Sequence, residues 1–472
     1  MLFNSIEYLL FLPVTFLVYW TWCSTAQSRR LCLLAASMVF YGWWDVRFLG
    51  LMWLTCLVGY VSALALEHSS GLRRKVVAAV GIALNLGVLG VFKYYDFFAQ
   101  SFASLAGHFG LSCHPVMLAV VLPVGISFYT FQTVGYVVDV YRGEIKAERD
   151  VVLFAVFVSF FPQLVAGPIE RARNLLPQFK VLRPFDRALA TDGMRQMLWG
   201  LMKKMLLADN CAVQVDYVFQ NYASLSAADL WLGAIYFAFQ IYGDFSGYSD
   251  MAIGSAKLFG VKLMRNFDLP YFALSVQDFW RRWHISLMAW LRDYLYVPLG
   301  GSRCGNLKHW RNVLLVFLVS GLWHGANWTF VVWGLYHGLL LLSFVVLLGH
   351  SGLAGSAQPL WHKVLGAAAT FVSVLVGWVI FRSESLSDAV SYLAAMFHWQ
   401  GALSLSCSRM PLLLIVALLL TEGLSRHKEH PLMLPARGLW QYGWARMVIY
   451  FLLFMATLWW GGEQQAFIYF QF

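Results

Sequence analysis

Charge is scarce in this chain. Asp, Glu, Lys and Arg make up only 12% of its 472 residues, whereas soluble globular proteins carry roughly 25%. Hydrophobic residues make up 60%, so the chain lacks the polar side chains that two or three soluble domains would need on their surfaces. The composition disfavours a cytosolic enzyme, a disordered regulator and a small disulfide scaffold. It predicts a polytopic membrane protein whose surface is covered by lipid.

Short motifs for metals, nucleotides and serine nucleophiles are also missing. The seven cysteines are scattered without a C-x-x-C pair, so they are expected to be small buried apolar residues. The sequence contains no G-x-x-x-x-G-K-[ST] phosphate loop, G-x-S-x-G elbow or H-E-x-x-H site. These absences weaken nucleotide-driven transport, serine hydrolysis and zinc catalysis. We expect no metal and no permanently bound cofactor.

An excess of positive charge is present, with 34 Lys and Arg against 24 Asp and Glu and a net charge of +10. In a soluble protein this balance would suggest a nucleic-acid partner. In a membrane protein the same excess marks cytoplasmic loops, so no nucleic-acid partner is expected.

Apolar segments recur along the whole chain. A bilayer crossing needs roughly 17 to 25 apolar residues, and several segments are shorter, so we predict 10 to 13 membrane segments. The expected fold is all-α, a polytopic helical membrane protein with re-entrant pieces around a central tunnel, built as one domain over residues 1–472. The first segment lacks a preceding Lys or Arg and a clear cleavage site, which favours a retained helix. The segments lie near 6–22, 31–44, 48–66, 76–95, 118–138, 151–167, 193–207, 229–242, 311–325, 328–348, 364–381, 411–424 and 446–460.

Short basic loops predict the orientation. Arg29 and Arg30 follow the first segment, and the cluster 73–75 follows the third. Because basic loops stay in the cytoplasm, both are expected there, with the N-terminus and the turn at 45–47 outside.

This scheme fails further along the chain. If every later segment crossed the membrane, the basic stretch 171–187 would lie outside. One segment between 118 and 167 is therefore expected to be re-entrant or broken, at Pro123 to Gly125 or at Phe161-Pro162. Irregular backbone at membrane depth must be buried in protein or line a cavity, so a cavity within the protein is predicted.

The stretch 278–295 has the pattern of one amphipathic helix. At 100° per residue, its apolar residues fall within one arc of about 140°, with His284 inside the arc and Arg281 and Arg292 beyond one edge. An imidazole in that face is expected to be neutral, because burial disfavours the charged form, and neutrality is what a general base requires. The alternative is a core histidine bonded to a backbone carbonyl.

His324 stands in the sequence Gly321-Leu-Trp-His-Gly325, at the junction of two long apolar segments. A histidine at membrane depth is costly and indicates function, and the glycines allow a backbone or a ligand to approach closely. The alternative role is an interhelical hydrogen bond. His337 lies about 220° around from His324 if one helix runs through both, so it is expected to point away from the side that His324 faces. It is the third candidate among the histidines, after His324 and His284.

Two carboxylates, Asp244 and Asp250, interrupt another apolar run. Buried acids need partners. Either Arg281, Arg282 or Arg292 pairs with them, which is the structural role that we favour, or Asp244 orients a catalytic imidazole.

At these residues the sequence resembles the membrane-bound O-acyltransferases, in their bacterial alginate O-acetyltransferase-like branch. Nine elements in the same order carry the resemblance across most of the chain, which makes it highly specific. They are Met1-Leu-Phe-Asn-Ser5, Leu122-Pro-Val-Gly-Ile-Ser-Phe-Tyr129, Val138-Asp-Val-Tyr-Arg-Gly143, Ala166-Gly-Pro-Ile169, Asp244-Phe-Ser-Gly-Tyr-Ser-Asp-Met-Ala252, Phe279-Trp-Arg-Arg-Trp-His-Ile-Ser286, Leu291-Arg-Asp-Tyr-Leu295, Gly321-Leu-Trp-His-Gly325 and Phe467-Ile-Tyr-Phe-Gln-Phe472.

The resemblance implies an O-acyltransferase of the bacterial inner membrane, in which His324 is the intramembrane catalytic histidine. His284 is the second one, expected either to bind donor or acceptor or to polarise the thioester carbonyl. It implies a tunnel where a thioester donor, acetyl-CoA, meets an acceptor from the other side of the membrane. A periplasmic acetyltransferase is an expected partner, and a polysaccharide is the expected acceptor. The residues predicted to bind donor or acceptor are Arg281, Arg282, Asp244 and Asn327.

Other functions remain open at the level of sequence. The glycan can be alginate, which we favour, or peptidoglycan or cellulose, and D-alanylation of teichoic acid is the activity of more distant relatives. A transporter would also have many spans and a cavity, but neither two related halves with interrupted helices nor a chain of intramembrane acids is evident. A non-catalytic scaffold for polysaccharide export would not need two histidines in such settings.

Overall fold

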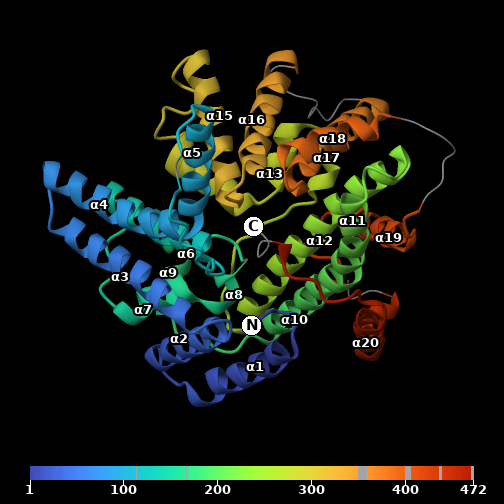
Figure 1. Cartoon of the computed structure of the whole chain (residues 1–472). Helices are drawn as coiled ribbons and strands as arrows, with labels where there is room; N and C mark the ends of the chain where they lie inside the picture. The colour runs from blue at the N-terminus through green and yellow to red at the C-terminus, as the bar shows by residue number, and fades with distance from the viewer. Residues whose placement is uncertain (113, 166, 349–358, 399–405, 435–437, 469–472) are drawn as a thin grey trace. The chain divides into compact units, whose positions relative to one another are not determined.

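The computed structural model describes residues 1–112, 114–165, 167–348, 359–398, 406–434 and 438–468. In these residues the chain forms helices and loops and no strand (Figure 1), so the protein is an all-α polytopic membrane protein, as predicted. Three predicted features reach beyond the described part: Cys113, Ala166 of the fourth shared element, and residues 469–472 of the last one.

The chain divides into two compact units. The first unit consists of Met1–Ala190 and Ala256–Met264, and the second of Thr191–Ser255 and Arg265–Phe472. The prediction of a single domain and a central tunnel stays a prediction.

In the first unit, helices α3, α4 and α6 pack against one another, and α3 and α4 run side by side (Figure 1). Helix α4 continues through a π-helical stretch, Gly90–Tyr94, into α5, so that Gly71–His108 forms one apolar helix of 38 residues. The helices of this unit are α1 Ile6–Leu17, α2 Ala26–Gly42, α3 Arg47–Glu67, α4 Gly71–Leu89, α5 Tyr95–His108, α6 Ile126–Arg142, α7 Val151–Ser159, α8 Phe161–Leu164 and α9 Ala172–Lys180.

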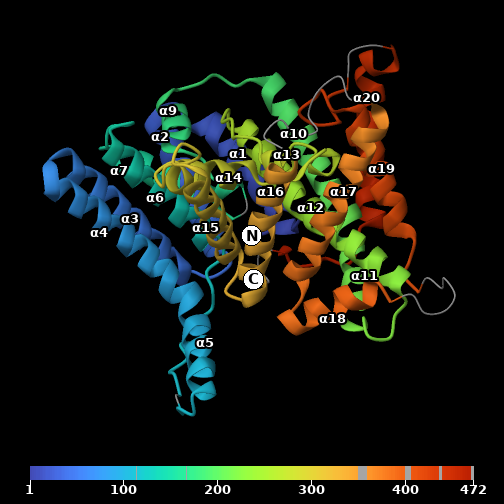
Figure 2. The same cartoon turned by 90° about the horizontal axis from the view of Figure 1, so that it is seen from above.

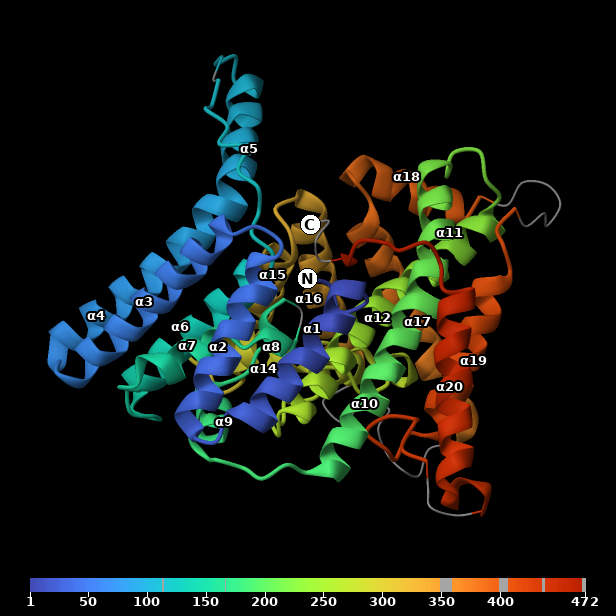
Figure 3. The same cartoon turned by 90° about the horizontal axis from the view of Figure 1, so that it is seen from below.

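The segment predicted at 151–167 is broken, as expected for one segment in this region. Helix α7 ends at Ser159, Phe160 takes an extended ψ of 108°, and α8 has only 4 residues. Figure 3 shows α7, α8 and α9 beside α2. Residues 153–164 are buried almost throughout, which satisfies the requirement that irregular backbone be enclosed by protein.

Both ends of this broken segment contact the basic loops. At its start, Asp150 pairs with Arg30 at 2.6 Å. After its end, Lys180 pairs at 2.6 Å with Glu148, which lies just before Asp150. The residues on either side of the segment are therefore held together, as a re-entrant segment requires, and its course through the membrane stays a prediction.

Helix α6 begins later than the predicted segment at 118–138, because residues 114–125 form no helix. Gly125 has φ +77°, and a Cβ there would lie 2.6 Å from the carbonyl oxygen of Leu164. Only glycine fits this left-handed position against α8, so the helix begins at Ile126.

In the second unit, α15 and α16 pack closely along their lengths (Figure 2). A Cβ on Gly321 would lie 2.2 Å from the Phe330 carbonyl oxygen, and one on Gly334 would lie 2.2 Å from that of Phe317. The glycines thus admit a neighbouring backbone. The α-helices are α10 Arg187–Met202, α11 Asp209–Gln220, α12 Ala227–Leu258, α13 Val276–Arg282, α14 Ile285–Leu291, α15 Asn306–His324, α16 Trp328–Leu348, α17 Leu360–Arg382, α18 Leu386–Met396, α19 Met410–Leu424 and α20 Gly443–Trp460; α10 starts, and α12 ends, within residues of the first unit.

Within the described residues, four helices are long and apolar enough to cross a membrane: Arg47–Glu67, Gly71–His108, Leu360–Arg382 and Gly443–Trp460. Three shorter apolar helices lie at Ile6–Trp22, Trp328–Phe344 and Met410–Leu424. The total of 10 to 13 membrane segments stays a prediction.

The single amphipathic helix predicted over 278–295 is wrong. The chain forms α13 and α14 with a break at Trp283 and His284. The amide of Ile285 donates to the Asn266 carbonyl at 2.9 Å, and that of Asp268 donates to the Arg282 carbonyl at 3.0 Å. A neighbouring segment therefore takes the backbone bonds that a continuous helix would use, and apolar periodicity cannot reveal such a partner.

Candidate active site

His284 and His324, predicted from separate motifs, lie together in the second unit. Their ring centroids are 6.4 Å apart, and their side chains are almost completely buried, with residue exposures of 1% and 3%. The ring of Trp323 contacts both, with centroid distances of 5.5 and 5.1 Å. The two histidines therefore share one aromatic enclosure, which we call the chamber.

His324 is the last residue of α15, where the helix stops at Gly325. Its ring meets those of Trp333 at 5.0 Å and Phe381 at 5.5 Å, on α16 and α17. These aromatic rings surround the imidazole, and the residue is 3% exposed.

His284 occupies the break between α13 and α14, with φ 45° and ψ 53°. A left-handed backbone is strained for any residue other than glycine and persists only when its surroundings hold it. The side chain is held as well: Nδ1 lies 3.1 Å from Asn266 Oδ1, and Phe245 packs on the ring at 4.7 Å. Sequence reasoning missed Asn266, because the only signal was one polar residue in a stretch without helical periodicity.

His337 is nearer to the chamber than its predicted angle suggests. No single helix runs through both histidines, since α15 ends at His324 and α16 begins at Trp328. The ring of Trp333 meets His337 at 5.1 Å as well as His324. Trp280 covers the His337 ring at 5.0 Å.

The two buried acids pair with lysines, so their predicted pairing with arginines is wrong. Asp244 lies 2.9 Å from Lys204, and Asp250 lies 2.6 Å from Lys203. Both lysines belong to a π-helical stretch, Lys203–Ala208, that continues α10. These ion pairs support the structural role, and a role of Asp244 in binding donor or acceptor stays a prediction.

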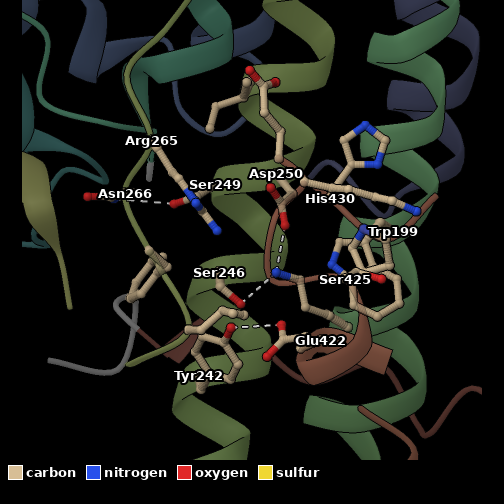
Figure 4. A pocket seen from close by; sticks show the side chains of 17 residues that line it. Trp199, Tyr242, Ser246, Ser249, Asp250, Arg265, Asn266, Glu422, Ser425 and His430 are labelled. Atoms are coloured by element: carbon tan, nitrogen blue, oxygen red, sulfur yellow. Dashed lines mark hydrogen bonds and ion pairs between the residues drawn. The ribbon is translucent and has the colours of Figure 1, made fainter. Parts of the chain in front are cut away.

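A small polar cavity of about 40 Å³ adjoins the Lys203–Asp250 pair. Among the residues that line it, Figure 4 shows Asn266 bonded to Ser249 and Tyr242 bonded to Glu422. Its volume suffices for one or a few water molecules. The polar groups of the cavity therefore lie next to Asn266, the residue that is hydrogen-bonded to His284.

The predicted binding arginines lie in two settings. Arg282 pairs with Asp278 at 2.8 Å, whereas Arg281 is exposed. Arg281 and Arg292 border a groove of about 570 Å³ with a mostly apolar lining. The other residues lining the groove are Gln277, Trp280, Ile285, Met288, Ala289, Tyr296, Ser302, His309, Val313, Val316, Phe317, Leu341 and Leu342.

Trp280 lies between this groove and the chamber, and its ring meets that of Trp333 at 5.7 Å. Trp333 in turn contacts His324. One layer of indole rings thus separates the groove from His324.

Asn327 caps α16. Its Oδ1 accepts from the Thr329 amide at 3.1 Å, and its Nδ2 donates to the Glu384 carbonyl at 3.0 Å. These bonds join the end of the His324 motif to the turn after α17, and a role in substrate binding stays a prediction. Within the described part of the chain, no group of three or more His, Cys, Asp or Glu side chains is arranged to hold a metal ion.

Comparison with known proteins places both histidines inside a recognised family. The model of MBOAT, the membrane-bound O-acyltransferase family, matches residues 149–387. Over 403 residues the chain is 42% identical to the "Probable alginate O-acetylase AlgI" of Azotobacter vinelandii, an alignment that covers 84% of this chain and 78% of that protein.

Two further relatives differ in their named acceptors. The chain is 37% identical over 435 residues to the peptidoglycan O-acetyltransferase of Helicobacter pylori, covering 85% of this chain and 80% of the relative. It is 28% identical over 289 residues to the teichoic acid D-alanyltransferase of Streptococcus thermophilus, covering 56% of this chain and 69% of the relative.

Proposed function

The chain belongs to the membrane-bound O-acyltransferase family and is an O-acyltransferase, and from this premise we propose that it transfers acetyl groups from acetyl-CoA for O-acetylation of a polysaccharide outside the bacterial inner membrane. Alginate is the favoured polysaccharide, because relatives named for alginate share 42% identity over most of the chain. Peptidoglycan is the second candidate, supported by 37% identity to the Helicobacter pylori relative.

The observation that carries the proposal is the pair of buried histidines in one aromatic chamber, 6.4 Å apart. In the proposed reaction the acceptor oxygen attacks the thioester carbonyl carbon, and His324 takes the hydroxyl proton. The carbon–sulfur bond then breaks, and the proton passes to the sulfur to give the free thiol. A positioned general base contributes roughly 10² to 10⁴ in rate, and His284 positions a reactant beside it.

The groove bordered by Arg281 and Arg292 supports a thioester donor with phosphates. Its apolar body fits the acyl-bearing arm of coenzyme A, and guanidinium groups bind phosphate oxygens in bidentate fashion. The stretch 292–308 is basic, with Arg292, Arg303 and Lys308 against Asp293, which favours the cytoplasmic side. His309 lies at that end of α15, and His324 lies 15 residues further along the helix. At 1.5 Å per residue the two are about 22 Å apart along the helix axis.

A periplasmic acetyltransferase is proposed to receive the acetyl group. The longest stretches between apolar segments are roughly 20 to 35 residues, too short for the ~50 residues of a small folded domain that could grip a polymer. The competing arrangement is direct transfer to a glycan at the mouth of the protein, for which the 21 Trp residues offer material.

The test is reconstitution of the purified protein in liposomes with acetyl-CoA, followed by measurement of free CoA and acetylated glycan. His324→Ala is expected to lower CoA release by at least 100-fold while the protein inserts and expresses normally, and His284→Ala to lower it less. The matched control is His68→Ala, a histidine exposed at the end of α3, which is expected to keep full activity.

Three results would count against parts of the proposal. Full activity of His324→Ala would remove the catalytic assignment. Efficient glycan acetylation by the protein alone would remove the partner, whereas CoA release that depends on a soluble periplasmic protein would support it. Acetylation of peptidoglycan fragments in preference to mannuronate oligomers would identify the second candidate acceptor.

A further inference from the structure

The orientation of the Asn266 side chain follows from its partners. Its Oδ1 faces the backbone amide of Ser286 at 3.3 Å and the Ser286 hydroxyl at 2.9 Å. A backbone N–H can only donate, so the atom that it faces must be the amide oxygen. The Nδ2 on the other side donates to Ser249 Oγ at 3.3 Å. Flipping the amide would place two donors against each other.

This orientation decides which nitrogen of His284 carries the proton. Nδ1 lies 3.1 Å from the same Oδ1, and an amide oxygen only accepts, so Nδ1 must be the donor. In a neutral imidazole the other nitrogen then holds a lone pair. Nε2 is buried and has no hydrogen-bond partner among the described residues.

From these contacts we infer that Asn266 is a positioning residue that locks His284 as the Nδ1–H tautomer, so that Nε2 accepts a hydrogen bond from the substrate hydroxyl. The inference rests on the proposed acyl transfer and refines it. A neutral His284 in this tautomer has no proton on Nε2, so it cannot polarise the thioester carbonyl. It orients the hydroxyl whose proton His324 takes.

The backbone supports the same assignment. The carbonyl oxygen of Asn266 accepts from the Ile285 amide at 2.9 Å, so one residue holds both the strained turn and the imidazole of His284. Asn266 itself is 1% exposed. Its position is therefore fixed by α12 through Ser249, by the turn, and by the ring that it orients.

The direct test reads the tautomer without turnover. Protein labelled with ¹⁵N-histidine gives different nitrogen shifts for Nδ1–H and Nε2–H imidazoles, and the spectrum of His284→Ala assigns the signal. We expect the Nδ1–H form in the wild type and a mixture in Asn266→Leu, which keeps the volume of the side chain but removes the acceptor. A wild-type signal with the proton on Nε2 would overturn the inference while leaving the proposed function standing.

The kinetic test separates positioning from general destabilisation. Asn266→Leu is expected to lower kcat roughly 10- to 100-fold with little change in KM for acetyl-CoA, part of the 10² to 10⁴ that acid–base groups supply. In the His284→Ala background the same substitution should cost nothing further, since residues that act as one unit are non-additive. Losses that simply add would mean that Asn266 only stabilises the fold.

A conservative variant and a control complete the test. Asn266→Asp keeps the acceptor and restores the tautomer, but its charge favours the protonated imidazole. Because activity needs neutral His284, the acid limb of the kcat profile should move to higher pH, and His324 is the one other titratable ring in contact with His284 among the described residues. An unmoved limb would contradict the inference. Asn85→Leu removes another buried amide, bonded within its own helix to Gly81 at 2.9 Å, and should leave kcat unchanged.

Discussion

At the scale of single residues, arginines that are close together in the sequence have different contacts in the structure. Arg282 is held by Asp278, whereas Arg281 and Arg292 border the apolar groove that leads towards His324. Arg292 also pairs with its neighbour Asp293 at 2.7 Å. Of these three arginines, we propose that Arg281 and Arg292, which border the groove, meet the phosphates of the donor.

We therefore predict that Arg281→Ala raises the KM for acetyl-CoA roughly tenfold with kcat nearly unchanged, the size expected for one hydrogen-bonded charge contact. Steady-state kinetics at several salt concentrations measures it, because the variant should also depend less on salt. Arg303→Ala removes an exposed arginine of the basic stretch 292–308 that does not border the groove, and it is the matched control. An equal rise in KM in the control would mean that only the general charge of the loop matters.

At the scale of elements, the end of the described chain is tied to α12 and to the π-helical stretch that follows α10. The Ile468 amide donates to Asp244 at 2.7 Å, and Lys204 donates to the Gln465 carbonyl at 3.1 Å. The ring of Phe467 packs on Tyr248 at 4.3 Å. A buried charge cluster thus holds the C-terminal segment against α12.

Removing the lysine from this cluster should be costly. Lys204→Met leaves Asp244 and Asp209 buried without their shared cation, which lies 2.9 and 2.8 Å away, and breaking such a group typically costs about 3 to 5 kcal/mol. A lower midpoint of unfolding in detergent, by several degrees, is the expected measurement. Arg47→Ala removes an exposed pair with Asp45 and should leave the midpoint almost unchanged; equal shifts in both variants would contradict the account.

At the scale of the whole molecule, the orientation in the membrane can be tested with single cysteines. Lys180→Cys lies after the broken segment, and Lys180 pairs with Glu148 just as Asp150 pairs with Arg30, so we expect it on the cytoplasmic side together with Arg73→Cys. Arg47→Cys, with a side chain 82% exposed, is the control expected outside. An impermeant maleimide applied to intact cells should label only Arg47→Cys, and external labelling of Lys180→Cys would overturn the re-entrant orientation.

The sequence alone determined the class of protein and the two central histidines. Composition required a lipid-covered helical protein, because polar residues were too few to cover soluble domains. His284 and His324 stood out because a polar ring at membrane depth is costly unless it has a use. A broken segment between 118 and 167 followed from counting charges on alternate sides, which needs no knowledge of packing, but the count did not choose between Pro123 to Gly125 and Phe161-Pro162.

Only the tertiary structure decided what each of these residues touches. Periodicity along one segment cannot show that Asn266 holds His284, or that lysines rather than arginines pair with Asp244 and Asp250, because the partners lie far away in sequence. The break at His284 has the same cause, since a neighbouring segment takes its backbone bonds. Local pattern reports burial, whereas hydrogen bonds between distant segments set the tautomer, the ion pairs and the turn on which the chemistry depends.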